Sequence, residues 1–453
     1  MALDLPSESV EELISDVPDI PRFLSAGELE ESAYALAREH PGEVRLRRIG
    51  HTAHGDALLG LEVGEGEKVA LLIGAPHPNE PLGTLTALHL ARALASNPGV
   101  TRRIGVRFFL IPAIDRDGLR LNEGWQTVPN FSLSRFAHYY YRPPARRQVE
   151  WGFPYFSDDY DFEMAPPETR ALAHLIDTMR PSLVYSLHNS SVGGVFYYLN
   201  RTVDGLQEAL VDVPARVGLP LEPAEPEEPW GTQFSPYILK RLSTHEAVQY
   251  LLAHNLEPRR VLTHGAGSLE YAESVNPTAL GLMAEVPLFP DPRVGDMTAA
   301  PVDRASLEAE RHQRRERVVN LLRSAYHTLH REGVLRPGTF RECLESSMEW
   351  QNRREGLAPQ PSPEGPVTVS EVFRHQVAAR FTDLRLLGTL FRFINEQAVP
   401  GTFAREGLLR STEDQIENVS RGLEANVRGH RVALKDLVEA QMAAGLHAIR
   451  FLD

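Results

Sequence analysis

Three observations predict an α/β fold, a mixed, mainly parallel sheet with helices on both faces, followed by a C-terminal helical region. Short apolar runs at residues 68–74, 106–115 and 183–188 are typical of buried strands. Segments of helical spacing separate these runs, and such alternation is typical of parallel sheets. The alternation stops near residue 300, beyond which the sequence has only helical patterns.

Residues 1–66 are predicted to contain an N-terminal arm, one helix and two strands. Residues 1–25 are acidic and interrupted by proline, so we expect an N-terminal arm. Ser25 is a suitable N-cap for a helix that ends before Pro41 and Gly42. Two short strands follow at 44–49 and 57–63, and the glycines at 64 and 66 allow a turn between the second strand and the next run.

The next unit is a strand, a helix and a strand. Residues 68–74 form a continuous apolar run, as in central parallel strands. Pro81 suits the first turn of a helix in which Leu82, Leu85 and Leu88 recur near helical spacing. The second strand is expected at 106–115, so a parallel crossover is the simplest connection. Residues 119–165 are aromatic with little periodicity, and we expect a long functional loop there.

The remaining elements divide the chain. After residue 166 the pattern predicts a helix at 167–176, strands at 183–188, 195–199 and 281–286, a loop at 220–236 and a helix near 243–254. Long helical patterns then cover 303–331, 369–398 and 412–447. We therefore expect an N-terminal arm (1–25), an α/β catalytic domain (26–300) and a helical accessory region (301–453).

Composition excludes several classes of protein. A length of 453 residues favours two domains. A formal net charge of -14 argues against nucleic-acid binding, which needs excess Lys and Arg. No run approaches the ~20 apolar residues of a membrane span. Cys343 is the single cysteine, so neither a disulfide nor a Cys-rich metal site can form. The first residues lack the segments of a secretory signal, and we expect a cytoplasmic protein.

Four side chains fall where predicted strands end. His77 and Glu80 follow the run at 68–74, His188 ends the run at 183–188, and Glu285 lies in the run at 281–286. Ligands collect beyond the carboxyl ends of strands in open α/β sheets. Two imidazoles and one carboxylate are a ligand set of catalytic zinc, which leaves one position for water. We therefore predict one Zn²⁺ per chain, with Glu285 acting on that water in a hydrolase.

These segments also resemble the zinc carboxypeptidases (metallocarboxypeptidases of the carboxypeptidase A type), over about residues 27–290. The resemblance is carried by the segments Arg48-Ile-Gly-His-Thr-Ala-His-Gly-Asp56, His77-Pro-Asn-Glu80, Ile114-Asp-Arg-Asp-Gly118, Pro167-Glu-Thr-Arg-Ala171, Leu187-His-Asn-Ser190 and Ala284-Glu-Val-Pro287. It implies a zinc carboxypeptidase-like fold and zinc-dependent hydrolysis of a peptide or amide bond. It also implies His77, Glu80 and His188 as zinc ligands and Glu285 as the general base.

The resemblance is weaker for residues that would bind substrate. Asp56 and Asn79 stand where the family usually has arginine, and its Asn–Arg pair has no plain match. Arg120 is the first candidate for stabilising the oxyanion and for binding substrate, together with Asn122 and Arg142. Arg146 and Arg147 are further candidates. The family's mobile tyrosine is also unmatched, although Tyr237 and Tyr271 lie near the expected segment.

Two other functions remain open. One is an N-acyl amino acid deacylase similar to succinylglutamate desuccinylase and aspartoacylase, against which the long segment 27–70 argues. The other is a non-catalytic, metal-stabilised binding or scaffold protein, against which Glu285 argues, because a structural metal needs no base. The expected partner is a small peptide or amide substrate, without nucleic acid or membrane, and any homo-oligomer would form through the helical region.

Overall fold

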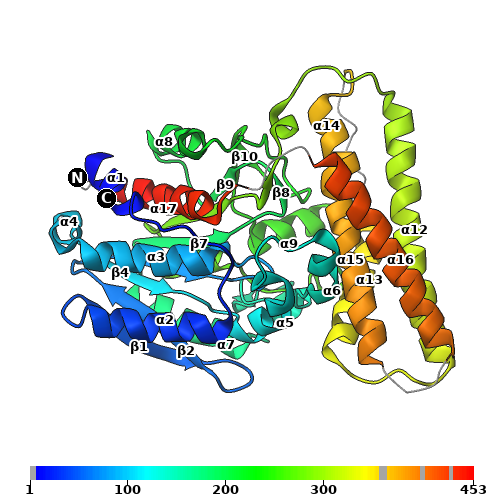
Figure 1. Cartoon of the computed structure of the whole chain (residues 1–453), viewed down its shortest axis with the longest axis horizontal. Helices are drawn as coiled ribbons and strands as arrows, with labels where there is room; N and C mark the ends of the chain where they lie inside the picture. Colours follow the sequence, from blue (N-terminus) through cyan, green and yellow to red (C-terminus); the bar gives the residue numbers. More distant parts are fainter. Residues whose placement is uncertain (1–6, 357–364, 398–402, 428–431, 453) are drawn as a thin grey trace.

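The computed structural model describes residues 7–356, 365–397, 403–427 and 432–452. A sheet flanked by helices forms one side of the molecule, and a bundle of long helices stands beside it (Figure 1). The predicted α/β fold with a C-terminal helical region is therefore confirmed.

The central sheet has nine strands in the order β1-β2-β4-β3-β7-β12-β9-β11-β10. Strands β4, β3, β7 and β12 are mutually parallel, whereas β1, β2, β9 and β10 each form antiparallel pairs. The bounds are β1 Val44–His51, β2 Ala57–Val63, β3 Lys68–Gly74, β4 Val106–Ile111, β7 Leu183–His188, β9 Phe196–Leu199, β10 Gln233–Ser235, β11 Ile238–Lys240 and β12 Leu280–Glu285. Strand β11 also pairs in parallel with β9 toward one edge, so the sheet is mixed, as predicted, with four parallel strands at its centre.

Helices cover both faces of this sheet. Along β3, Ala70 and Leu72 belong to one hydrophobic cluster and Leu71 and Ile73 to another, because successive side chains of a strand point to opposite faces. The first cluster packs under α2 (Ala26–Glu39), α3 (Leu82–Ser96) and α17 (Leu434–Arg450), and the second under α7 (Pro167–Met179) and α11 (Ser268–Val275). Ser25 caps α2 through a capping box with Glu28, as its sequence predicts.

The segment predicted as a long loop, residues 119–165, contains regular structure. It holds most of α5 (Arg116–Gln126), then α6 (Leu133–Tyr139), a 3₁₀ turn (Ala145–Arg147), β5 (Tyr155–Phe156) and β6 (Asp161–Phe162). Asp115, predicted as the end of a strand, is instead the N-cap of α5 and accepts a hydrogen bond from the Gly118 amide. Trp125 is fully buried against Phe131 and Phe136, so these three aromatic residues of the segment form part of the core.

Smaller elements complete the sheet domain. They are α4 Pro98–Ile104, β8 Val192–Gly193, α8 Leu206–Asp212, a 3₁₀ turn at Pro214–Val217, α9 Thr244–Ala253, α10 Pro258–Val261, β13 Phe289–Pro290 and a 3₁₀ turn at Pro292–Gly295. Parallel pairing of β13 with β8 holds the chain that follows β12 against the chain that follows β7. The chain segments that follow β7 and β12 therefore stay side by side beyond the ends of those two strands.

The helical region contains α12 (Arg304–Arg331), α13 (Thr339–Gly356), α14 (Val369–Phe373), a π-helical turn (Arg374–Ala378), α15 (Ala379–Glu396) and α16 (Phe403–Asn426). Leu322, Leu329, Leu344 and Phe393 are buried together between α12, α13 and α15. The helix predicted over 412–447 is instead two helices, α16 and α17, and α13 was not predicted. No helix within the described ranges combines the length and apolarity needed to cross a membrane.

Both ends of the predicted domain division need correction. Helix α1 (Ser7–Ile14) buries Val10 and Leu13 against α3 and α17, so residues 7–14 pack on the domain and do not form a free arm. Residues 1–6 lie outside the described residues. Helix α17 packs on α3, β7 and β12, and Gln441 donates a hydrogen bond to the backbone carbonyl of His188. The last helix of the predicted accessory region is therefore part of the sheet domain.

Candidate metal centre

The candidate ligands and Glu285 lie where three parallel strands end. His77 and Glu80 occupy the loop between β3 and α3, and His188 is the last residue of β7. Glu285, the last residue of β12, pairs in register with His188. Ala75 opens the loop with a positive φ of 50°, a left-handed conformation that few non-glycine residues adopt. The parallel register thus brings together side chains from segments that are far apart in sequence.

Close packing of α3 on β7 contributes to this convergence. At Gly83, a Cβ atom would lie 2.5 Å from the Cβ of Leu187, so only glycine fits there without movement of the chain. The first turn of α3 therefore approaches the end of β7 closely. Because Glu80 immediately precedes this turn and His188 follows Leu187, the contact places the Glu80 carboxylate beside the His188 imidazole.

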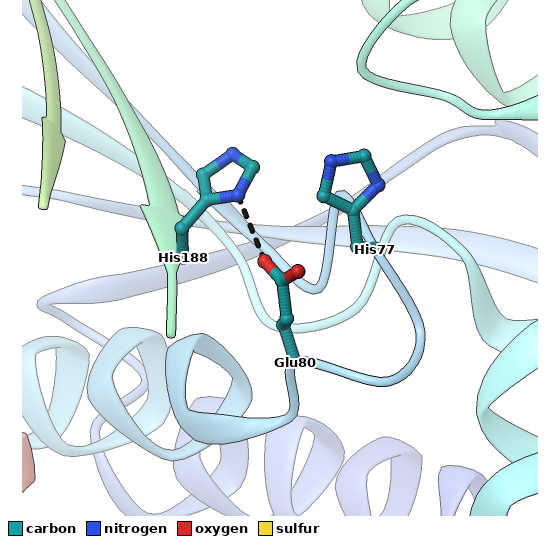
Figure 2. Close-up of side chains that lie close together, drawn as sticks. All are labelled: His77, Glu80 and His188. Atoms are coloured by element: carbon teal, nitrogen blue, oxygen red, sulfur yellow. Dashed lines mark hydrogen bonds and ion pairs between the residues drawn. The ribbon is translucent and has the colours of Figure 1, made fainter. Parts of the chain in front are cut away.

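The three predicted ligands form one buried cluster (Figure 2). One candidate ligand atom from each of His77, Glu80 and His188 lies within 4.8 Å of the others. His188 Nδ1 is 2.8 Å from Glu80 Oε2, and the two imidazole rings have centroids 5.0 Å apart. Their side chains converge from a loop and a strand end, as the sequence predicts.

This cluster fits a zinc ion. His77 Nδ1 is buried and has no hydrogen-bond partner among the described residues, although buried polar atoms nearly always have one. Two imidazole nitrogens and a carboxylate oxygen match the donor set of catalytic zinc, which three protein ligands hold. The unpaired nitrogen and the donor chemistry therefore both agree with a metal bound by His77, Glu80 and His188.

Glu285 lies beside the cluster. Its Oε1 is 3.8 Å from His188 Nδ1, and its side chain is 16% exposed. Burial and the negative charge of Glu80 raise the pKa of Glu285 to about 8, although His188 and Arg142 oppose this shift. The carboxylate thus faces the ligands without belonging to their cluster, which is the position required of a base that acts on a water at the metal.

Glu150, a buried carboxylate that the sequence did not predict, is linked to His188 through Ser186. Its Oε2 accepts a hydrogen bond from Ser186 Oγ at 2.8 Å, and Ser186 Oγ is 3.1 Å from His188 Nε2. Its Oε1 accepts from Ser268 Oγ at 2.7 Å. Burial lowers the pKa of His188, but hydrogen bonds with Glu150 and Glu80 raise it overall to about 10. The chain Glu150–Ser186–His188 orients the imidazole so that Nδ1 faces the other ligands.

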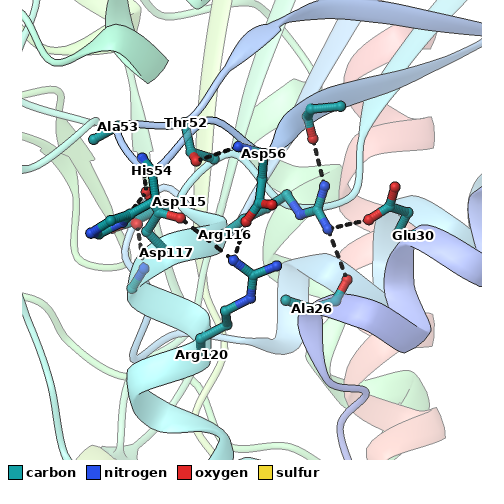
Figure 3. A network of polar contacts seen from close by, with 12 residues as sticks. Ala26, Glu30, Thr52, Ala53, His54, Asp56, Asp115, Arg116, Asp117 and Arg120 are labelled. Atoms are coloured by element: carbon teal, nitrogen blue, oxygen red, sulfur yellow. Dashed lines mark hydrogen bonds and ion pairs between the residues drawn. The ribbon is translucent and has the colours of Figure 1, made fainter.

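Of the predicted substrate-binding residues Arg120, Asn122 and Arg142, only Arg142 lies at the candidate site. Arg120 pairs with Asp56 on the outer side of α5, in the network of Figure 3. Asn122 is buried and bonds the backbone of Tyr141 through both its oxygen and its nitrogen. Neither residue lines the cavity at the metal ligands. Arg142, in contrast, donates from Nη1 to Glu80 Oε1 at 2.7 Å and lies at the centre.

The cluster opens into a cavity of about 850 Å³. Tyr140 and Tyr198 line it, whereas Tyr237 and Tyr271 do not. Glutamates of the predicted loop at 220–236 form part of its wall, as do residues of α13 and α15 in the helical region. The loop and the helical region therefore both belong to the site, although no sequence motif connects either of them to the ligands.

Comparison with known proteins agrees with this geometry. The family model described as zinc carboxypeptidase matches residues 29–204, which include all three predicted ligands but not Glu285. This segment is zinc carboxypeptidase-like. The resemblance noted in the sequence is therefore confirmed over this range, and zinc is the metal that the family implies. No curated protein matches this chain significantly.

Several solved structures are similar to parts of this chain. Bovine thrombin-activatable fibrinolysis inhibitor, in complex with tick carboxypeptidase inhibitor, is 12% identical with a TM-score of 0.38, over 58% of this chain and 86% of that chain. Carboxypeptidase A from Helicoverpa armigera is 14% identical with a TM-score of 0.40, over 63% and 72%. A succinylglutamate desuccinylase from Silicibacter is 14% identical with a TM-score of 0.28, over 54% and 59%.

Proposed function

We propose that this protein is a zinc-dependent hydrolase of peptide or amide bonds, of the metallocarboxypeptidase type. One observation carries the proposal. His77, Glu80 and His188 form a buried cluster at the end of a cavity, and Glu285 reaches the same point from the neighbouring strand. A metal that only stabilised the fold would need neither the cavity nor the additional carboxylate.

The side chains of this site divide the work of hydrolysis. Zinc held by His77, Glu80 and His188 would supply Lewis acidity and lower the pKa of a water molecule. The Glu285 carboxylate takes the proton of the attacking water and delivers it to the leaving amine. Glu150 holds His188 in place through Ser186, so that the imidazole does not rotate during the reaction.

Arg142 takes the role that the sequence analysis gave first to Arg120. Its guanidinium reaches the Glu80 carboxylate at the cavity wall, whereas Arg120 is paired with Asp56 outside the cavity. A fixed guanidinium beside the metal ligands is suited to stabilise negative charge on the carbonyl oxygen of the scissile bond.

Two variants test this proposal. Purified protein should hold about one zinc per chain, His77→Ala should lose it, and the exposed His51→Ala should keep it. Glu285→Gln should retain zinc and lose nearly all hydrolysis, because it removes a base and no ligand. Equal zinc in wild type and His77→Ala, or near wild-type turnover by Glu285→Gln, would refute the assignments.

A substrate panel separates the peptidase from the second candidate, an N-acyl amino acid deacylase. That candidate is favoured by the cavity, because about 850 Å³ is a volume typical of small-molecule sites and helices bound one side of it. Peptides with free and amidated C-termini and a series of N-acyl amino acids should be compared. Hydrolysis of free peptides alone indicates a carboxypeptidase, and hydrolysis of acyl amino acids alone indicates the deacylase. The scaffold alternative predicts no turnover with any of them.

A further inference from the structure

The helical region forms a wall of the candidate site. Ser346, Ser347 and Trp350 of α13 and Arg385 and Thr389 of α15 line the same cavity as the predicted metal ligands. Both helices lie outside the segment that matches the zinc carboxypeptidase model, which ends at residue 204. The chemistry of this wall is therefore a property of this chain and does not follow from the family match.

Arg385, on that wall, has a positive charge that no carboxylate of the described residues pairs with. Its Nη2 donates to Ser191 Oγ at 2.6 Å, and its Nε is buried without any hydrogen-bond partner among the described residues. No carboxylate of the described ranges lies within ion-pair distance of it. A partly buried charge without a counter-ion is costly, so an anion from outside the chain would stabilise this arrangement.

The other arginines that line the cavity do have ion-pair partners. Each forms an ion pair with a glutamate of this chain, in the pairs Arg142–Glu80, Arg241–Glu273, Arg353–Glu349 and Arg374–Glu225. Arg385 lines the cavity with them but has no such pair in the described structure. The unmatched positive charge of the cavity is therefore localised on α15.

This charge lines the same cavity as the metal ligands. Ser191, which holds the guanidinium, is three residues beyond His188, and the hydroxyl of Ser190 is buried without a partner among the described residues. The fully buried phenol of Tyr140 is influenced by both groups: burial raises its pKa, Arg385 lowers it and Glu80 raises it. Two residues with an unsatisfied donor, Arg385 on α15 and Ser190 on the chain after β7, thus line the cavity that holds the predicted metal ligands.

The acidic loop at 220–236, which also lines the cavity, does not have an equivalent unmatched charge. Glu225 pairs with Arg374, and Glu222 accepts a hydrogen bond from the Gly194 amide at 2.9 Å. Burial raises the pKa of Glu222 to about 7, which weakens its negative charge near neutral pH. The loop therefore gives less support to a basic substrate than Arg385 gives to an acidic one.

We propose that Arg385, assisted by Ser190, binds a carboxylate of the substrate and that the helical region thereby selects acidic substrates. This proposal rests on the proposed function for its reacting bond, but the binding of an anion by Arg385 can be measured separately. Guanidinium and carboxylate form strong, oriented hydrogen bonds, whereas an amide of the same shape lacks the charge. Arg385 is thus a specificity-determining residue supplied by the helical region.

A series of ω-mercapto carboxylic acids of increasing length, compared with the corresponding amides, tests this proposal on the full-length, zinc-loaded protein. The thiol binds the metal and the carboxylate reaches Arg385. Calorimetry should show that at one length the acid binds at least about tenfold more tightly than the amide. Arg385→Gln should abolish this preference and Arg385→Lys should retain part of it. Arg374→Gln, which changes an arginine already paired with Glu225, should leave it unchanged.

A preference for the acid that persists in Arg385→Gln, or one that Arg142→Gln abolishes instead, would overturn the assignment. Zinc content and glutarate binding separate this proposal from the proposed function. Protein that binds no zinc would contradict the proposed function alone, and glutarate titrated into the same protein would still test Arg385. Glutarate should bind the wild type at least about tenfold more tightly than Arg385→Gln, and equal binding would overturn the proposal.

Discussion

Ser186→Ala tests whether Glu150 holds His188 in position for the metal. Ser186 is fully buried on β7, and its hydroxyl lies between Glu150 Oε2 at 2.8 Å and His188 Nε2 at 3.1 Å. The hydroxyl donates to the carboxylate, so it accepts from the Nε2–H tautomer of the imidazole. That tautomer leaves Nδ1 free to bind the metal. Replacement by alanine removes this bridge and leaves the strand and the ligands in place.

The expected loss follows from the contacts that remain. Glu150 keeps its bonds to the Ser268 amide and hydroxyl, so the carboxylate stays where it is. His188 loses the hydrogen bond at Nε2 and keeps only the 3.8 Å contact of that nitrogen with Glu150 Oε2, so its orientation and tautomer are held less firmly. Loss of such an outer partner typically weakens metal binding by about 10–100-fold. This corresponds to roughly 1.4–2.8 kcal/mol of binding free energy.

Zinc affinity is measured by competition with a chromophoric chelator at constant pH. Ser268→Ala is the matched control, because it removes a hydrogen bond from the same carboxylate but has no contact with His188. We expect the control to lose about 1 kcal/mol of folding stability and to keep the wild-type zinc affinity. Equal zinc affinity in wild type and Ser186→Ala, or an equal loss in both variants, would refute the positioning role.

Three further predictions concern the surrounding structure. Burial raises the pKa of Asp115 to about 7, so the folded protein holds this proton more tightly than the unfolded chain does, and stability falls as the pH rises from about 4 to about 7. Asp115→Asn should reduce this fall in urea unfolding, and an unchanged pH profile would contradict it. A Cβ at Gly445 would lie 2.8 Å from the ring of Tyr185, so Gly445→Val should lower the melting temperature by several degrees, whereas Gly407→Val, in open space, should not. Equal effects would argue against the packing of α17 on the sheet. Arg120→Ala should keep kcat/KM within about twofold of wild type, because Arg120 lies outside the cavity, and a tenfold loss would restore its predicted role.

The residues of the metal centre could be predicted from the sequence because each of them lies next to a strand that a short stretch of sequence reveals. His77 and Glu80 follow one apolar run, His188 ends another and Glu285 ends a third. Parallel strands place their carboxyl ends at one edge of a sheet, so the position of each residue at a strand end was enough to predict that they meet. The helical C-terminal region was predictable for a similar reason, since helical periodicity is a property of short segments.

Other parts of the site depend on contacts between distant segments. Glu150 lies in a stretch without periodicity, and only the packing of that stretch behind β7 brings it to Ser186. Arg120 and Arg142 cannot be ranked from sequence, because the choice depends on the pairing of Arg120 with Asp56, 64 residues away. Arg385 reaches the site because α15 packs against α6 and lines the cavity. Side-chain packing between separate elements leaves no periodic signal in either one, so the walls of the cavity were decided by the tertiary structure.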